Sequence, residues 1–139
     1  MYTDIIFLFN LGSSLFMMGL IWYVQLVHYP GFRFIHPERF DEFHQFHSRF
    51  TGIIVAPVML TELGTSFYLF LNDTALGYQA IGFYIVVLIW ISTAFLSVPS
   101  HKILSGNKND SEIDKLINTN WIRTGLWTAK AFLGLYLVI

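Results

Sequence analysis

Histidine is the residue type in this chain best suited to hold a metal ion or a cofactor. The sequence has 139 residues, five of them histidine, and it contains no cysteine, which excludes disulfides and thiolate metal sites. Neutral imidazole is a common ligand of iron, copper and zinc. We expect His28, His47 and His101 to converge, because the apolar stretches that carry or precede them end on one side of the membrane.

The segment that contains His47 is expected to be an amphipathic helix beginning at Pro37, which suits the first helical position. At 100° per residue, His47 shares an apolar face with Phe40, Phe43 and Phe50. His44 flanks that face, but a His-x-x-His pair is a weak signal by itself. Pro99 is expected to end or kink the helix that precedes His101, so the direction of His101 stays open.

The histidines therefore predict a site for a transition metal (iron, copper or zinc) or for haem b. His28, His47 and His101 are the candidate metal ligands, and His28 and His101 also serve the haem alternative. Gln25, one turn before His28, is a candidate cofactor-binding residue that would orient the imidazole. The alternative is that these histidines are unconnected residues of the membrane interface.

Two ionisable residues lie deep inside apolar stretches. Glu62 is about 10 residues and Lys130 about 9 residues from the cytoplasmic end of its stretch, so both lie roughly 14–15 Å deep at 1.5 Å per residue. Equal depth and opposite charge predict an ion pair, because an unpaired charge at the bilayer centre costs several kcal/mol. The pair either fixes the helix register or takes part in function, as a proton relay or a substrate anchor.

A polar stripe follows one face of the last apolar stretch. Asn120, Arg123, Trp127 and Lys130 recur at spacings of three and four residues, which places them on one side of a helix. Such a stripe is expected to face the protein interior, since lipid cannot solvate it. The candidate catalytic residues are therefore Glu62, Lys130, Arg123 and Asn120.

The elements that position these residues are predicted to be all α-helical and to lie in a membrane. Hydrophobic residues make up 55% of the chain and charged residues only 12%, against about a quarter in soluble proteins. A helix crosses the hydrocarbon core with about 20 apolar residues. Four stretches qualify, 5–27, 52–71, 76–98 and 121–139, so residues 1–139 are read as a single domain, a four-transmembrane-helix bundle. No basic residue precedes the first stretch, which is expected to remain as a helix rather than be removed as a signal peptide.

Two polar connections, 28–51 and 99–120, are each expected to contain a cytoplasmic amphipathic helix. Seven of the eight basic residues lie in these connections or directly after them, and the exception is Lys130. The positive-inside rule places both connections in the cytoplasm and both termini outside, in a protein integral to the cytoplasmic (inner) membrane. Nucleic-acid binding is not expected, because eight basic residues are balanced by nine acidic ones.

Four runs of sequence resemble a family of small, largely uncharacterised bacterial four-span integral membrane proteins. They are Gln25-Leu-Val-His28-Tyr-Pro30-x-Phe32, Pro57-Val-Met-Leu-Thr-Glu62, Val98-Pro-Ser-His101-x-x-Leu104 and Asn120-Trp-Ile-Arg123-Thr. The resemblance covers nearly the whole chain and implies the four-span fold. The Trp-Ile-Arg start of the last stretch is also similar, more distantly, to the anthrone-oxygenase-like membrane proteins, which implies an oxygenase or another oxidoreductase.

These observations favour a membrane-embedded oxidoreductase that acts on a lipophilic small molecule and depends on a metal or on haem. The alternative is a non-enzymatic transport, assembly or accessory subunit, with the Glu62–Lys130 ion pair as a structural element. In that case a homo-oligomer or a partner membrane protein would cover the remaining polar surface. Metal content and visible absorbance distinguish the two hypotheses.

Overall fold

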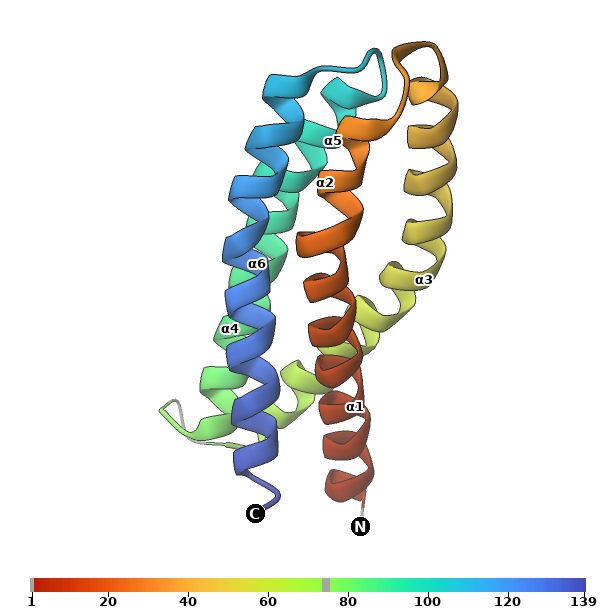
Figure 1. Cartoon of the computed structure of the whole chain (residues 1–139). Coiled ribbons are helices and arrows are strands. Elements are labelled where there is room, and N and C mark those ends of the chain that lie inside the picture. The colour runs from red at the N-terminus through yellow and green to blue at the C-terminus, as the bar shows by residue number, and fades with distance from the viewer. Residues whose placement is uncertain (1, 74–75) are drawn as a thin grey trace.

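The computed structural model describes residues 2–73 and 76–139, and all the regular structure in these two ranges is helical (Figure 1). The long helices are α1, α3, α4 and α6, and short helical segments extend α1 and α4. The elements are α1 (Tyr2–Tyr23), η1 (Val24–His28), α2 (Tyr29–Gly31), η2 (Phe32–Phe34), α3 (Pro37–Leu71), α4 (Tyr78–Ser92), η3 (Thr93–Ser97), α5 (Val98–Leu104) and α6 (Asp110–Tyr136).

The long helices pack side by side as a bundle. α1 contacts α3 and α6, and α4 contacts the same two helices from the other side. The beginning of α1 and the end of α6 lie at one end of the bundle, and the α2–α3 and α5–α6 connections lie at the other (Figure 1). The core between the helices combines aliphatic residues such as Met17 and Ile89 with large aromatic ones such as Phe32 and Trp127.

Three helical stretches of the described chain are long and apolar enough to cross a membrane: Asp4–Phe34, Pro37–Leu71 and Tyr78–Leu104. These are the dimensions and composition of an integral membrane protein. α6 is not among them, although it is 27 residues long and packs within the bundle. It is the most polar of the long helices, with Asp110 and Glu112 in its first turn and Arg123 and Lys130 further along.

The prediction of separate connecting helices is wrong. The predicted surface helix of residues 37–51 and the second span form one continuous helix, α3, and residues 113–117 belong to the same helix as the fourth span, α6. No proline lies near Thr51, and the single glycine that follows it, Gly52, weakens a helix without ending it, so backbone hydrogen bonding continues from the polar end into the apolar stretch. The only proline inside α3 is Pro57, and α3 bends along its length (Figure 1), as an internal proline favours.

Two wide π-helical turns each precede a proline by two residues. The Tyr29 N–H donates to the Val24 carbonyl before Pro30, and the Val98 N–H donates to the Thr93 carbonyl before Pro99. A proline has no N–H and its ring crowds the carbonyl four residues back, and a wider turn relieves that conflict. The helix therefore continues through Pro99 into α5 instead of ending there, and His28 and His101 both lie at or just after a π turn.

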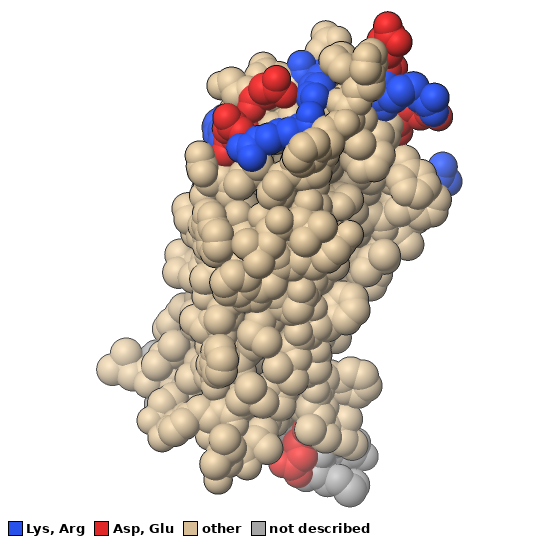
Figure 2. All heavy atoms as spheres, viewed as in Figure 1, with Lys and Arg blue, Asp and Glu red and all other residues tan. Residues whose placement is uncertain are grey.

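Charged side chains gather at the end of the bundle that carries the α2–α3 and α5–α6 connections (Figure 2). There Arg33 binds Asp114, and Lys108 Nζ donates to the carbonyls of Arg33 (2.8 Å) and Ile35 (2.9 Å), so the two connections are joined to each other. The Ser100 hydroxyl donates to Glu112, which lowers the pKa of this carboxyl. On the face shown in Figure 2, the opposite end carries little charge and the surface between the two ends is broad and almost uncharged.

Candidate functional site

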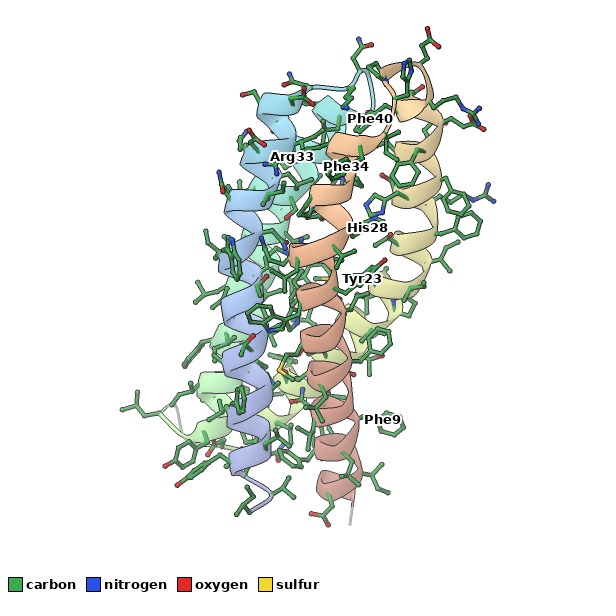
Figure 3. All side chains as sticks on the ribbon, viewed as in Figure 1. Phe9, Tyr23, His28, Arg33, Phe34 and Phe40 are labelled. Atoms are coloured by element: carbon green, nitrogen blue, oxygen red, sulfur yellow. The ribbon has the colours of Figure 1, made fainter. Side chains whose placement is uncertain are left out.

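Four of the five histidines meet at the inner side of the α3 N-terminal half. His28 points from the end of the first helical stretch toward α3 (Figure 3), where its Nε2 lies 2.6 Å from His47 Nδ1. The ring centroids of His28 and His47 are 4.4 Å apart, and those of His47 and His101 are 5.5 Å apart. The structure therefore brings His28, His47 and His101 together.

The fourth member of the cluster, His44, is a residue that the sequence analysis did not select. His44 Nε2 lies 3.0 Å from His101 Nδ1, and the other nitrogen of His101, Nε2, lies 3.0 Å from the Tyr29 hydroxyl. The Nδ1 atom of His44 is buried and has no hydrogen-bond partner among the described residues. The His44-x-x-His47 spacing was the signal for its inclusion, since residues three apart on a helix lie on neighbouring positions of one face.

The fifth histidine, His36, lies outside the cluster. It is exposed at the start of α3, where its Nδ1 accepts a hydrogen bond from the Glu38 N–H at 3.4 Å. This is helix capping, which satisfies a backbone donor that has no partner within the helix. His36 therefore provides a control for the other four histidines.

Phenylalanine rings hold the imidazoles in place. The buried Phe32 ring makes edge contacts with His28, His44 and His47 at centroid distances of 5.4, 6.0 and 5.2 Å. Phe40, also fully buried, stacks on His44 at 5.8 Å. The predicted apolar face of this helix is only partly correct, because the inward residues are Phe40, His44 and His47 while Phe50 is exposed.

The imidazoles in this structure are joined in pairs by hydrogen bonds. Across residues 2–73 and 76–139, no three histidine, aspartate or glutamate side chains are arranged around a common point as in a formed metal site. Neighbouring nitrogens in a tetrahedral zinc site are about 3.3 Å apart, because metal–nitrogen bonds are about 2.0–2.1 Å long. The two histidine pairs, at 2.6 and 3.0 Å, are somewhat shorter than this separation. Binding an ion would therefore require the nitrogens of each pair to move apart and to turn toward a common point.

A cavity of about 240 Å³ adjoins the cluster. His47, His101, Tyr29 and Arg123 line it together with four serine and threonine residues, and the rest of the wall is apolar, with residues from α1, α3 and the α4–α5 region. The cavity thus places an apolar space beside two of the predicted metal ligands. Glu62, Lys130 and Asn120 do not line it.

Gln25 and Asn120 bind each other rather than the histidines. The Asn120 side-chain amide donates to Gln25 Oε1 at 2.9 Å, and Thr124 donates to the same oxygen at 3.2 Å. The Gln25 amide in turn donates to the Ile117 carbonyl at 3.0 Å. These bonds occupy the Gln25 side chain and tie the first helical stretch to α6, so no contact supports the predicted role of Gln25 in orienting His28.

Glu62 and Lys130 are both buried in the other half of the bundle and are connected through Ser14. Glu62 accepts hydrogen bonds from Ser14 (2.7 Å) and from the Trp127 indole (2.9 Å). Lys130 Nζ lies 2.6 Å from Asn10 Oδ1 and 3.4 Å from Ser14 Oγ. The carboxylate and the ammonium are not within 4.0 Å of each other, so a direct ion pair is replaced by a bridged one.

Asn10 and Ser14 are therefore members of this network that the sequence analysis missed. The Asn10 amide donates to Ser66 Oγ at 2.7 Å and to Thr65 Oγ1 at 2.9 Å, in addition to its contact with Lys130. Asn10 and Ser14 lie four positions apart inside an apolar stretch. That spacing places them on one face of a helix, and it was the available signal for a polar contact there. On α4, Gly82 leaves room for the lysine stem, since a Cβ there would lie 3.3 Å from Lys130 Cε.

Comparison with protein-family models, curated proteins and solved structures finds no match to this chain.

Proposed function

We propose that this protein is a membrane-embedded oxidoreductase that holds a transition-metal ion in its histidine cluster and acts on a lipophilic molecule in the adjoining cavity. The observation that carries the proposal is the convergence of His28, His44, His47 and His101 beside a largely apolar space. Sites for small molecules are typically apolar cavities with a few convergent polar groups. This arrangement has both parts.

A metal ion fits the cluster better than haem. The centroids of neighbouring imidazole rings are 4.4–6.1 Å apart, and Phe32 and Phe40 pack directly against the rings. This spacing leaves no room for a macrocycle between the imidazoles. Iron or copper is favoured over zinc for this reaction class, because zinc has no redox chemistry. A bound iron or copper ion would supply one-electron chemistry at the end of the cavity.

The chain's own residues would orient the ligands and exclude water. Tyr29 binds His101 Nε2 and Thr51 Oγ1 lies 3.0 Å from His47 Nδ1, so each hydroxyl influences which ring nitrogen carries the proton. Phe32 and Phe40 pack against the rings without lining the cavity, so they would keep water from the ring surfaces they cover. A substrate would reach the cluster through the cavity wall formed by His47 and His101.

Metal analysis of the purified full-length protein tests this function. We expect about one iron or copper ion per chain, bound after dialysis, and no Soret band. The His28→Ala/His47→Ala/His101→Ala variant should lose the metal. A Soret band would favour haem b, and a metal-free, colourless wild-type protein would favour the non-enzymatic alternative.

The non-enzymatic alternative has its own supporting observation. Glu62, Lys130 and Asn10 are bonded to protein groups, and Glu62 and Lys130 do not line the cavity beside the histidines. Such a network fits a structural role in fixing helix register. A transport, assembly or accessory subunit, alone or as a homo-oligomer, would then use the bundle as a scaffold.

We further propose that the protein lies in the inner membrane with α6 as a fourth span. The charged end of the bundle then faces the cytoplasm, and both termini lie on the outer side of the membrane. The basic residues near the two long connections support this orientation. Alkaline phosphatase fused to the C-terminus should be active, and a fluorescent protein fused at the same position should stay dark. The same reporters inserted in the 106–109 loop should give the reverse result, and equal signals at both positions would contradict the topology.

A further inference from the structure

Arg123 is a buried cation that has no carboxylate partner among residues 2–73 and 76–139. Its side chain is 7% exposed and lines the cavity beside the histidines. Its NH1 group donates to Ser97 Oγ (2.9 Å) and Asn120 Oδ1 (3.2 Å), while its Nε has no hydrogen-bond partner among the described residues. Among these described residues, no aspartate or glutamate side chain lies within 4.0 Å of the Arg123 guanidinium.

The neighbours of Arg123 stabilise the guanidinium but do not neutralise it. The Trp127 ring lies under the guanidinium carbon at 5.1 Å, a cation–π contact, and the Tyr29 hydroxyl lies beside the same group. Ser97 and Asn120 contribute only neutral oxygens. A buried charge is costly unless it is paired, so the side chain retains a strong preference for an anion that arrives from the cavity.

The rest of the cavity selects the form of that anion. Apolar side chains of α1 and α3 line it, including Met17, Leu20, Ile21 and Val55. Its volume of about 240 Å³ lies below the range of roughly 300–1,000 Å³ typical for drug-sized ligands. It therefore suits one narrow acyl chain better than a fused ring system or a two-chained lipid.

We propose that the cavity binds a long-chain carboxylate, with its head group on Arg123 and its acyl chain along α1 and α3. The two oxygens of a carboxylate match the fork geometry of a guanidinium, and its single charge matches the single cation present. A phosphate monoester carries almost two charges, and the cavity lining offers no second Lys or Arg. The ligand's role as the substrate rests on the proposed function, whereas its binding requires Arg123 and not the metal.

The experiment is a displacement assay on full-length protein in neutral phosphatidylcholine nanodiscs, after treatment with a chelator to remove metal. A fluorescent conjugated-polyene C18 carboxylate is the probe, protein-free nanodiscs are the blank, and dodecanoate, dodecanol and dodecyl phosphate are the competitors. Dodecanoate should displace the probe at a concentration about tenfold or more below that of dodecanol, the preference expected from one charge-assisted hydrogen bond. Because the protein is metal-free, failure of the metal hypothesis would not affect this result.

Variants separate the head-group contact from the cavity itself. In Arg123→Gln, dodecanoate and dodecanol should displace the probe at equal concentrations. Arg123→Lys should keep part of the preference for dodecanoate. Gly52→Leu should weaken the binding of both competitors, because Gly52 lines the cavity and the new side chain would occupy part of it. The substitution should be tolerated, since a Cβ at Gly52 meets no atom within 4 Å. Gly64→Leu is the matched control, since Gly64 lies on the same helix, has equally open space and does not line the cavity.

Several outcomes would overturn the proposal. One is equal displacement by dodecanoate and dodecanol in the wild type, and another is a carboxylate preference that survives in Arg123→Gln. Tighter displacement by dodecyl phosphate would assign the site to a phosphate head group instead. Should Arg123→Gln fail to fold, as judged by circular dichroism, the contrast between Gly52→Leu and Gly64→Leu still decides whether the probe occupies this cavity.

Discussion

Glu62→Leu is expected to lower the free energy of unfolding by about 3–5 kcal/mol, because it leaves a buried ammonium without its nearby carboxylate. Lys130 is 5% exposed and Glu62 1% exposed, so water solvates neither group well. The substitution also removes the acceptor of the Ser14 hydroxyl and of the Trp127 indole. Reversible unfolding in mixed micelles, followed by circular dichroism, measures the loss.

The double variant Glu62→Leu/Lys130→Met should be less destabilised than Glu62→Leu alone. Removing both charges leaves no uncompensated ion in the bundle, which is why buried ion pairs tolerate joint replacement better than single replacement. Glu42→Leu is the control on the same helix, since its partly solvated contact with Arg39 is worth about 1 kcal/mol or less. A double variant as unstable as the sum of the two single variants would show that the charges do not interact across Ser14.

His47→Ala is expected to reduce metal affinity about 100-fold or more, the largest effect among the single histidine replacements. His47 is the central member of the cluster, with ring centroids 4.4 Å from His28, 5.5 Å from His101 and 6.1 Å from His44. Removing it separates His28 from the other two rings. Titration calorimetry with Fe²⁺ or Cu²⁺ on the chelator-treated protein measures the affinity.

His36→Ala is the matched control for this titration. His36 is exposed and caps α3, so its replacement should leave metal affinity unchanged while costing about 0.5–2 kcal/mol of stability. His44→Ala should weaken binding as well, because His44 pairs with His101. Equal losses in His36→Ala and His47→Ala would point to adventitious binding at the surface and contradict the site.

Local patterns in the sequence were sufficient to predict which residues lie at the same depth along the bundle axis. The ends of the first and third apolar stretches placed His28 and His101 at one level, and the rise of 1.5 Å per residue placed Glu62 and Lys130 at another. These inferences hold because rise and periodicity are properties of the helix itself. Pro37 also correctly predicted the start of α3, because proline's missing N–H and fixed φ suit the first helical position.

Predictions of where a helix begins or ends, and of the direction of a side chain after an irregular turn, were less successful. A break was expected between the second connection and the last apolar stretch, but one helix, α6, begins after the Asn109 cap and runs through both; the Asn109 side chain accepts from the Glu112 N–H at 3.0 Å. The π turn at Thr93–Ser97 adds a residue to one turn, which rotates His101 by about 100° relative to a regular helix. The direction of His101 was left open because of Pro99, and a helical wheel cannot represent this additional shift.

Composition and helical periodicity were enough to predict a helical, apolar chain with its five histidines on one side of the membrane and two opposite charges at similar depth. The pairing of these side chains could be read only from the packed bundle. It placed His44 beside His101, bound Gln25 to Asn120, and put Ser14 between Glu62 and Lys130. The reason is that each pairing depends on the rotation of one long helix against another, and many contacts from the whole packed interface fix that rotation.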